Sequence, residues 1–157
     1  MAKIVTKVGI EVDGKMLVDV TFDEIIPLEF QNGEISDNIF ITTEGDEKGL
    51  LILRTDKKET ISKYSPINSI VFANPKCICV TEYDERLGTR AALISTENLH
   101  DLTSYHHDEI YYVTDELYIT KKDGLYGVVN HLGEEIMQNK FSNVAYDKTN
   151  NAFIAKV

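Results

Sequence analysis

The densest group of side chains that could carry chemistry lies between residues 100 and 109. It holds His100 and Asp101, followed by the run His106-His107-Asp108-Glu109. Imidazole and carboxylate groups bind zinc and similar ions, and a catalytic site combines about three of them with an open position for water. In an extended chain, however, alternate residues face opposite ways, so one ion can reach only part of the run. We interpret the run as a polar loop that enters a strand.

A metal-dependent hydrolase is the alternative interpretation of this cluster. It would use His100, His106, His107 and Asp108. The spacing lacks the i, i+4 separation through which a helical His-Glu-x-x-His sequence presents two histidines to one ion. The alternative predicts stoichiometric metal in the purified protein, whereas our preferred interpretation assigns no metal, no cofactor and no catalytic residue.

The chain has two cysteines, Cys77 and Cys79. In an extended segment their side chains point to one face, with Cα atoms about 6.5 to 7 Å apart, which is at the limit of disulfide geometry. A structural zinc site needs four ligands, and no second cysteine pair is present. We therefore expect two reduced thiols that are buried in a strand.

No other pattern of a nucleophile or a phosphate-binding loop is present. No serine lies in a Gly-x-Ser-x-Gly elbow, and Gly45, Gly49 and Gly88 are isolated rather than gathered before a helix. Five tyrosines could form a stacking platform for sugars or bases, but tyrosine is also an ordinary filler of packed strands, which is the role we expect. They are Tyr105, Tyr111, Tyr112, Tyr118 and Tyr126. His131 lies in an expected turn and is assigned no role.

Acidic side chains are unevenly distributed along the chain. The 157 residues include 16 Lys plus Arg and 26 Asp plus Glu, which gives a formal net charge of −10. The segment from Glu11 to Glu47 has eleven acidic residues and one basic residue, Lys15, so it alone sums to −10 and the remainder sums to zero. The eleven are Glu11, Asp13, Asp19, Asp23, Glu24, Glu29, Glu34, Asp37, Glu44, Asp46 and Glu47.

This acidic segment, residues 11–47, creates a local potential that can steer a positively charged protein and raise its association rate. Nucleic-acid binding is not expected, because the neutralisation of phosphates needs a clustered basic surface. The alternative is a solvated face that only keeps the protein soluble. The residues that we expect to contact a basic partner are Asp19, Asp23, Glu24, Glu29, Glu34 and Asp37.

Length and composition are those of a folded domain. A chain of 157 residues with 43% hydrophobic and 27% charged residues can bury a core, and we expect one β-repeat domain over residues 1–157. No segment approaches about 18 consecutive apolar residues, and the first residues lack the apolar core of a signal peptide. We therefore expect a cytoplasmic protein that contacts no membrane.

The elements that position these side chains are short and rich in Ile, Val, Tyr, Phe and Thr. Turn-forming pairs such as Asp13-Gly14, Asn32-Gly33, Asp123-Gly124 and Asn150-Asn151 separate them. No window holds an apolar i, i+3, i+4, i+7 stripe long enough for a helix, so the sequence predicts an all-β fold. The expected strands are Ile4–Val12, Asn38–Thr43, Leu50–Leu53, Ser69–Ala73, Cys77–Val80, Ala91–Ile94, Ile110–Val113, Leu117–Thr120, Leu125–Val129 and Ala152–Val157.

A short cassette recurs four times. It starts with a marker of the type Tyr/Phe-x-x-Ile/Val, whose aromatic residue is lost in the two middle copies, and continues with strands joined by turns. The markers are Phe22-Asp23-Glu24-Ile25, Ile67-Asn68-Ser69-Ile70, His107-Asp108-Glu109-Ile110 and Phe141-Ser142-Asn143-Val144. Their final residues are 45, 40 and 34 positions apart. The sequence thus predicts four degenerate repeats of three or four strands.

Two of these units align closely. Gly9–Ile25 and Gly127–Val144 share a leading glycine, a second glycine eight residues before a phenylalanine, and an apolar residue five before it. The stretch KDGLYGVVNHLGEEIMQNKFSNV resembles the WG β-repeat of bacterial proteins, with Tyr126-Gly127 where that family has Trp-Gly. The resemblance covers residues 122–147 and, more weakly, residues 8–27, and the chain contains no tryptophan. It implies a β-rich repeat and supplies no catalytic residues.

The two ends of the sequence read like parts of one unit. The last unit stops after two strands, at Phe153–Val157, and Ile4–Val18 reads like the missing third strand and its connection. If the N-terminal strand completes the last unit, the four units close into a propeller-like ring that protects the sheet edges. A linear array with polar capping repeats is the alternative.

Together these features favour binding over catalysis. A small acidic protein with concentrated charge suits the masking of a basic active surface, as an immunity protein does for a nuclease toxin. We therefore expect a non-catalytic immunity or inhibitor protein that neutralises a basic toxin, such as a nuclease domain. The alternatives are the metal-dependent hydrolase and a general interaction scaffold with several weak partners.

Overall fold

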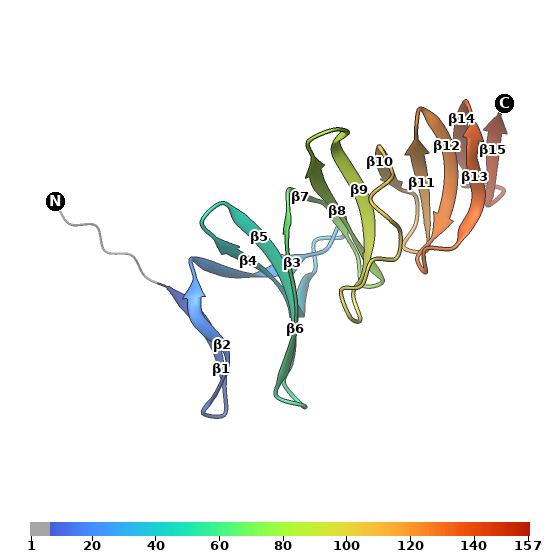
Figure 1. The fold of residues 1–157 in the computed structure, drawn as a ribbon. Coiled ribbons are helices and arrows are strands. Elements are labelled where there is room, and N and C mark those ends of the chain that lie inside the picture. Colours follow the sequence, from blue (N-terminus) through green and yellow to red (C-terminus); the bar gives the residue numbers. More distant parts are fainter. Residues whose placement is uncertain (1–6) are drawn as a thin grey trace. The chain divides into compact units, whose positions relative to one another are not determined.

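The computed structural model describes residues 7–157, and this range contains no helix. Within it, fifteen strands pair antiparallel in five small sheets. Figure 1 labels the strands in chain order. The all-β prediction is therefore confirmed. The chain divides into two compact units, Met1–Ile67 and Asn68–Val157, each of which is described by itself. That both belong to the single domain expected over residues 1–157 stays a prediction.

The first unit contains a two-stranded sheet, β1–β2, and a four-stranded sheet, β3–β6. Its strands are β1 (Val8–Val12), β2 (Lys15–Phe22), β3 (Glu24–Glu29), β4 (Ile35–Glu44), β5 (Glu47–Arg54) and β6 (Glu59–Ile67). A small core joins the two sheets, in which Val18 and Phe22 of β2 are buried together with Leu51 of β5. Ile25 and Phe40 pack against this core, so β2 lies against one face of the larger sheet.

The second unit contains sheets of three, four and two strands, β7–β9, β10–β13 and β14–β15. Its strands are β7 (Ser69–Ala73), β8 (Cys77–Asp84), β9 (Gly88–Ser95), β10 (Glu109–Tyr112), β11 (Leu117–Lys122), β12 (Leu125–Asn130), β13 (Glu135–Phe141), β14 (Asn143–Asp147) and β15 (Ala152–Lys156). Cys79 and Leu93 of the first sheet are buried with Ile110, Tyr118 and Val129 of the second. The core of this unit therefore lies between the first two sheets.

Each strand expected from the sequence overlaps a strand of the structure, although residues 4–6 of the first expected strand lie outside the described residues. Five further strands, β2, β3, β6, β13 and β14, were not expected. Four of them, β2, β3, β6 and β13, pair with their neighbours across register shifts. A shift interrupts the alternation of apolar and polar residues, which is the signal that identifies a strand in a sequence.

The four cassette markers fall where the described chain passes from one sheet to the next. The second residue of each marker lies between two strands, and its backbone N–H donates to a carbonyl on the second strand of the following sheet. The four bonds are Asp23 to Thr43 at 2.8 Å and, at 2.7 Å each, Asn68 to Thr81, Asp108 to Lys121 and Ser142 to Lys156. The sequence repeat therefore corresponds to a junction that the structure builds in the same way each time.

A glycine facing a wide bulge is the second recurring feature. In the β1–β2 pair, Val8 lies opposite Phe22 and Ile10 opposite Val18, so β2 advances four residues while β1 advances two. Gly9 lies at this point, and a Cβ atom there would be 2.4 Å from the carbonyl oxygen of Val18. Because no side chain tolerates such an approach to backbone, the bulge requires glycine.

The same bulge occurs in two other strand pairs. In the β12–β13 pair it faces Gly127, where a Cβ atom would lie 2.5 Å from the carbonyl oxygen of Met137. In the β5–β6 pair it faces Gly49, which lies between Lys48 and Leu50. The bulge therefore marks the last two strands before three of the four junctions, whereas the β8–β9 pair that precedes the Asp108 junction has a regular register.

No closed ring is formed by the described residues. β1 pairs with β2 and β15 pairs with β14, and no pairing between β1 and β15 is present in this range. The expectation that the N-terminal strand completes the last unit is therefore not met within residues 7–157. The similarity of strands in a sequence indicates equivalent positions in a repeat, but it does not establish which sheet edges meet.

Candidate partner-binding surface

All eleven acidic residues of segment 11–47 are exposed, and they lie at two ends of the first unit. The end that carries the β4–β5 turn points upward in Figure 1, whereas the β1–β2 and β5–β6 turns point downward. Around the β4–β5 turn lie Asp19, Asp23, Glu24, Glu44, Asp46 and Glu47, which we call the acidic end. Nearer the opposite end lie Glu11, Asp13, Glu29, Glu34 and Asp37.

Backbone pairing and one direct contact bring the acidic end together. Glu44 and Glu47 are opposite each other across the β4–β5 turn. Gly45, in the same turn, donates its backbone N–H to Oδ2 of Asp23 at 2.7 Å. Asp19 and Glu44 both line a small surface pocket of about 220 Å³. Carboxylates from β2, the β2–β3 junction and the β4–β5 hairpin therefore share one surface.

Few basic groups accompany these carboxylates. Lys7 pairs with Asp23, and Lys48 lies on β5 opposite Thr43, which in turn lies opposite Glu24 on β3. The other five residues of the acidic end, Asp19, Glu24, Glu44, Asp46 and Glu47, form no ion pair within the described part of the chain. The negative charge of this end is therefore mostly uncompensated.

The opposite end of the first unit has a more mixed charge. Asp13 lies 3.9 Å from the Nζ atom of Lys58, and Arg54 pairs with Glu59 at 3.3 Å. Lys57 lies in the same β5–β6 turn as Lys58. Basic side chains are thus interspersed with the acidic ones here, and a basic partner gains less from this end.

The six residues expected to contact a partner are divided by the fold. Asp19, Asp23 and Glu24 belong to the acidic end, and Glu29, Glu34 and Asp37 lie around the β3–β4 hairpin at the other end of β4. The structure therefore does not bring all six together. The expected contacts did not include Glu44, Asp46 and Glu47. The gap between the expected strands 38–43 and 50–53 was nevertheless a sufficient signal for the turn around which these three residues lie.

The two units carry equal net charge. Each contains 13 acidic and 8 basic side chains, a net charge of −5. In the first unit, seven basic and two acidic residues outside segment 11–47 bring the net charge from the −10 of that segment to −5. The acidic end is therefore distinguished by where its charges lie and not by the total charge of its unit.

Asp23 has a structural role that the sequence did not indicate. Its carboxylate accepts hydrogen bonds from Lys7 and from the backbone of Gly45. The Lys7 bond is the main reason why the pKa of Asp23 lies below its ordinary value, and the Gly45 bond acts in the same direction. Because its oxygens already have partners, Asp23 is a less suitable contact for another protein than its neighbours Asp19 and Glu24.

Asp108 occupies the equivalent junction in the second unit. It accepts a hydrogen bond from Arg90 at 2.5 Å and another from the backbone of the turn residue Gly124 at 3.2 Å. Both junctions therefore combine a carboxylate, a turn glycine of the following sheet and a basic side chain, from β9 in the case of Arg90 and from the residue before β1 in the case of Lys7. Both carboxylate oxygens of Asp108 are therefore already engaged within the protein.

The histidines of the alternative interpretation do not converge. His107 is 8% exposed, its Nδ1 atom is 3.1 Å from the carbonyl oxygen of Ser104, and burial lowers its pKa. The backbone of His107 pairs with Ala91, so the segment beside β9 takes the place of a fourth strand. Among the described residues, no group of three or more His, Cys, Asp or Glu side chains is placed to hold a metal ion.

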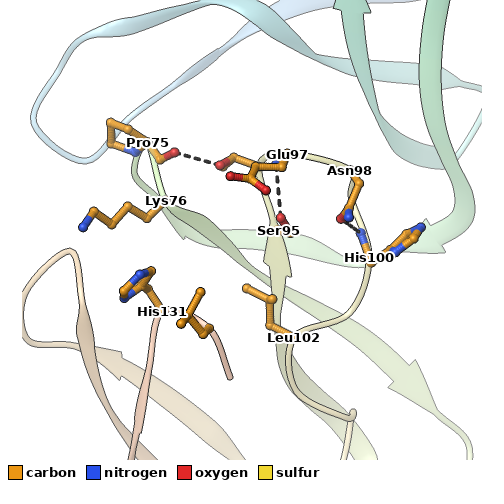
Figure 2. Close-up of a pocket in the computed structure, with 10 residues that line it drawn as sticks. Pro75, Lys76, Ser95, Glu97, Asn98, His100, Leu102 and His131 are labelled. Atoms are coloured by element: carbon orange, nitrogen blue, oxygen red, sulfur yellow. Dashed lines mark hydrogen bonds between the residues drawn. The ribbon is translucent and has the colours of Figure 1, made fainter. Parts of the chain in front are cut away.

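His100 lies instead in a surface pocket of about 420 Å³ in the second unit, shown in Figure 2. His131, to which the sequence assigned no role, lines the same pocket, and its Nδ1 atom is buried without a hydrogen bond in the described structure. Lys76 also lines it but pairs with Glu116 at 2.5 Å. The pocket therefore has two imidazoles near one engaged ammonium group, and no set of ligands that points to one ion.

Tyr118 and the two cysteines serve the core of the second unit, whereas Tyr111 and Tyr112 are exposed. Tyr118 is fully buried, stacks on Phe72 with ring centroids 5.4 Å apart, and accepts hydrogen bonds from Asn74 at 2.8 Å and Cys77 at 2.9 Å. Cys77 and Cys79 are buried free thiols, as expected. Burial raises their pKa values to about 11 and about 12, respectively. These groups are packing residues rather than a ligand platform.

Comparisons with known proteins add no function to this geometry. No family model matches the chain, and neither the curated proteins nor the solved structures include a match. In residues 7–157 the structure also has no helix of the length and apolarity needed to cross a membrane. The chemistry of the surfaces described above is therefore the basis for a functional proposal.

Proposed function

We propose that this chain is a non-catalytic, acidic protein-binding protein, and that it acts as an immunity or inhibitor protein that masks the active surface of a basic toxin such as a nuclease domain. The observation that carries this proposal is the acidic end of the first unit. Six exposed carboxylates lie there around one turn, and within the described residues one of them, Asp23, is paired with a lysine.

The physical basis is electrostatic complementarity. A nuclease surface that binds phosphates presents clustered Lys and Arg side chains, and carboxylates at the acidic end can occupy the positions that phosphates would take. Exposed charges of one sign also increase the rate of encounter with an oppositely charged protein. The pockets and the histidines offer no comparable match to a substrate, because their polar groups do not converge.

The repeated fold also supports a role as a binding module. We attribute the recurring junction and bulge to four degenerate repeats of the type that the WG β-repeat resemblance implies. Such arrays present side chains from several turns on one surface. Two buried free thiols fit a reducing compartment, so we place the protein in the cytoplasm.

The proposal is tested with two variants of equal charge. The first, Asp19→Asn/Glu24→Gln/Glu44→Gln, removes three charges from the acidic end and leaves Asp23 in place. The second, Glu29→Gln/Glu34→Gln/Asp37→Asn, removes three charges from the opposite end. Each is used to capture the product of the adjacent open reading frame from cell extract, because toxin and immunity genes travel together.

We expect the unaltered chain and the second variant to capture a basic protein. The first variant should capture at least about tenfold less of it, because close charge pairs at such interfaces contribute about 1.5 kcal/mol or more each. Equal losses in both variants would show that only net charge matters and would contradict a defined site. Absence of a basic protein from the capture would contradict the proposal as a whole.

A further inference from the structure

The smallest sheets of the structure, β1–β2 and β14–β15, each correspond to one half of a four-stranded sheet such as β3–β6 or β10–β13. The complete sheets β3–β6 and β10–β13 define four strand positions in chain order, and positions two and three form the centre of each sheet. Figure 1 shows the two half-sheets as single hairpins. Which half each represents follows from the junction and the bulge described above.

The β14–β15 hairpin occupies positions one and two. A junction residue precedes position one in each complete sheet, and its N–H donates to the strand at position two, from Asp23 to Thr43 and from Asp108 to Lys121. Ser142 precedes β14 and donates to Lys156 on β15 at 2.7 Å in the same way. β15 therefore corresponds to β4 and β11, the strands that are paired on both edges.

The β1–β2 hairpin occupies positions three and four. In both complete sheets these two positions carry the wide bulge opposite a glycine, at Gly49 and at Gly127. The β1–β2 hairpin has the same bulge opposite Gly9, and the junction residue Asp23 follows it directly. β1 therefore corresponds to β5 and β12, which are likewise paired on both edges.

We infer that β15 of one copy of this chain pairs antiparallel with β1 of a second copy, which completes a four-stranded sheet across the two molecules. In complete sheets, the acceptor of the junction bond lies opposite the residue before the bulge glycine, as Thr43 lies opposite Lys48 and Lys121 opposite Tyr126. The same rule places Lys156 opposite Val8. The register then sets Ala155 against Gly9, Ile154 against Ile10 and Ala152 against Val12.

The side chains at these positions suit burial. Ile154 is 62% exposed in the single chain, whereas Cys79, at the same position in the β7–β9 sheet, is fully buried in the core. Ile10, its partner in the inferred register, already packs against the core of the first unit. Pairing therefore extends that core by one apolar side chain. It also covers two strand edges that have no partner among residues 7–157, and such edges otherwise invite uncontrolled association.

Two copies are sufficient to satisfy both half-sheets. Each copy has one β1 edge and one β15 edge, and a reciprocal exchange uses all four edges in a closed dimer. The expected mass in solution is therefore twice the chain mass of 17.8 kDa. This inference is independent of the proposed function, because the acidic end is not used in the pairing.

Cross-linking of two single variants tests the register directly. Ile10→Cys and Ile154→Cys are prepared separately, mixed and oxidised, since opposite residues in antiparallel strands have Cα atoms about 4.5 to 5.5 Å apart, within the range for a disulfide. Val12→Cys and Ala152→Cys form a second pair in case substitution of the half-buried Ile10 impairs folding. The native thiols are buried, so their background reaction is slow.

The inference requires that each mixture yields a dimer that joins the two different variants. A mixture of Ile10→Cys with Ile136→Cys, an exposed apolar position on β13, is the control and yields none. The double variant Ile10→Cys/Ile154→Cys distinguishes pairing between two copies from pairing within one chain. If β15 pairs with β1 of the same chain, the double variant gives an internally linked monomer and the mixtures give no dimer. That result, or the absence of any cross-link from both pairs, overturns the inference.

Light scattering provides the second readout. The unaltered chain and an Ile136→Lys variant are expected to have the mass of a dimer, and Ile154→Lys that of a monomer at the same concentration, because a buried lysine would oppose pairing. Both substituted positions are exposed in the single chain, at 52% and 62%, so both variants should fold. Monomers in all three samples, or a dimer that Ile154→Lys leaves intact, contradict the inference.

Discussion

At the residue scale, Asp23 and Asp108 occupy equivalent junctions between sheets and have the same kinds of partner, a basic side chain and a turn glycine, but they differ in burial. Arg90 and Asp108 have 11% and 28% of their side chains exposed, and Arg90 also donates to the carbonyl oxygen of His106. Lys7 and Asp23 are exposed at 41% and 36%. The desolvated pair loses more when one partner is removed, because the remaining charge has less access to water.

Substitution Asp108→Asn is therefore expected to destabilise the protein by about 1.5–3 kcal/mol, the range for a hydrogen bond to a charged group. Urea denaturation followed by circular dichroism measures this change. Asp23→Asn is the matched substitution at the exposed junction, and its effect should be smaller. An effect of Asp23→Asn equal to or larger than that of Asp108→Asn would show that burial does not determine the contribution of these junctions.

The Asp23 junction should also respond to pH. The pKa of Asp23 is lower in the folded protein than its ordinary value, mainly through the hydrogen bond from Lys7. Its stabilising contribution is thus present above the ordinary carboxyl pKa of about 3.9 and is lost as the pH falls through the lower folded value. The difference in stability between the unaltered chain and Asp23→Asn should shrink from pH 7 to pH 3. A constant difference across this range would exclude ionisation of Asp23 as its source.

The two thiols should be unreactive in the folded protein. Cys77 and Cys79 are buried and their pKa values are raised to about 11 and about 12, so the thiolate fraction at pH 8 is very small. Ellman's reagent should therefore label neither thiol in native buffer and both in denaturant. Rapid labelling of one thiol without denaturant would show that this strand opens. Burial of this pair was predictable from sequence, because an apolar run surrounds it and no ligand partners exist.

At the scale of elements, the bulge glycines are the positions where the backbone leaves no room for a side chain. A Cβ at Gly127 would lie 2.5 Å from the carbonyl oxygen of Met137, which is part of the backbone and cannot rotate away. Gly127→Ala is expected to destabilise the protein by about 1–3 kcal/mol, as overpacking does. Ala92→Gly is the control, since Ala92 is a buried alanine in the β7–β9 sheet, and its cost should be about 0.5–1 kcal/mol.

Thermal unfolding of the two variants measures this difference. A Gly127→Ala protein as stable as the unaltered chain would mean that β13 can move away from β12 without loss. The equivalence of Gly9 and Gly127 was visible in the sequence, because the stretches that begin at these two glycines align with each other. The bulge itself was not, since the residues opposite the glycine vary in polarity and match no strand pattern.

The limits of sequence reasoning at this scale follow from the kind of signal available. Strands such as Cys77–Asp84 and Leu117–Lys122 carry apolar runs that identify them directly. The marker residues identify the junctions because the chain ends one sheet and begins the next at each marker. β2 and β13 are mostly exposed along their length, and no local pattern separates such strands from loops.

At the scale of the whole molecule, charge along the sequence and charge on the surface are different quantities. The sequence shows eleven acidic residues in one segment, but β4 extends over ten residues, from Ile35 to Glu44, and separates them into two groups. Glu34 and Asp37 near the start of β4 are therefore distant from Glu44 at its end. The β5–β6 hairpin places Lys58 and Arg54 near one of these two groups and so leaves the charge of the other group mostly uncompensated. The spacing of residues in the sequence does not show where this hairpin places its basic side chains.

The acidic end should also control the rate at which a basic partner binds. If the acidic end steers association, the association rate constant should fall at least tenfold between about 0.02 M and 0.5 M salt, because the Debye length shortens from about 20 Å to about 4 Å. The dissociation rate constant should change much less. Stopped-flow or surface-based kinetics with the captured protein measures both constants. The Asp19→Asn/Glu24→Gln/Glu44→Gln variant should have a slower association rate and a weaker salt dependence, whereas Glu29→Gln/Glu34→Gln/Asp37→Asn should resemble the unaltered chain. A salt dependence that is the same in all three proteins would assign the steering to the net charge of −10 and not to the arrangement of charges around the β4–β5 turn.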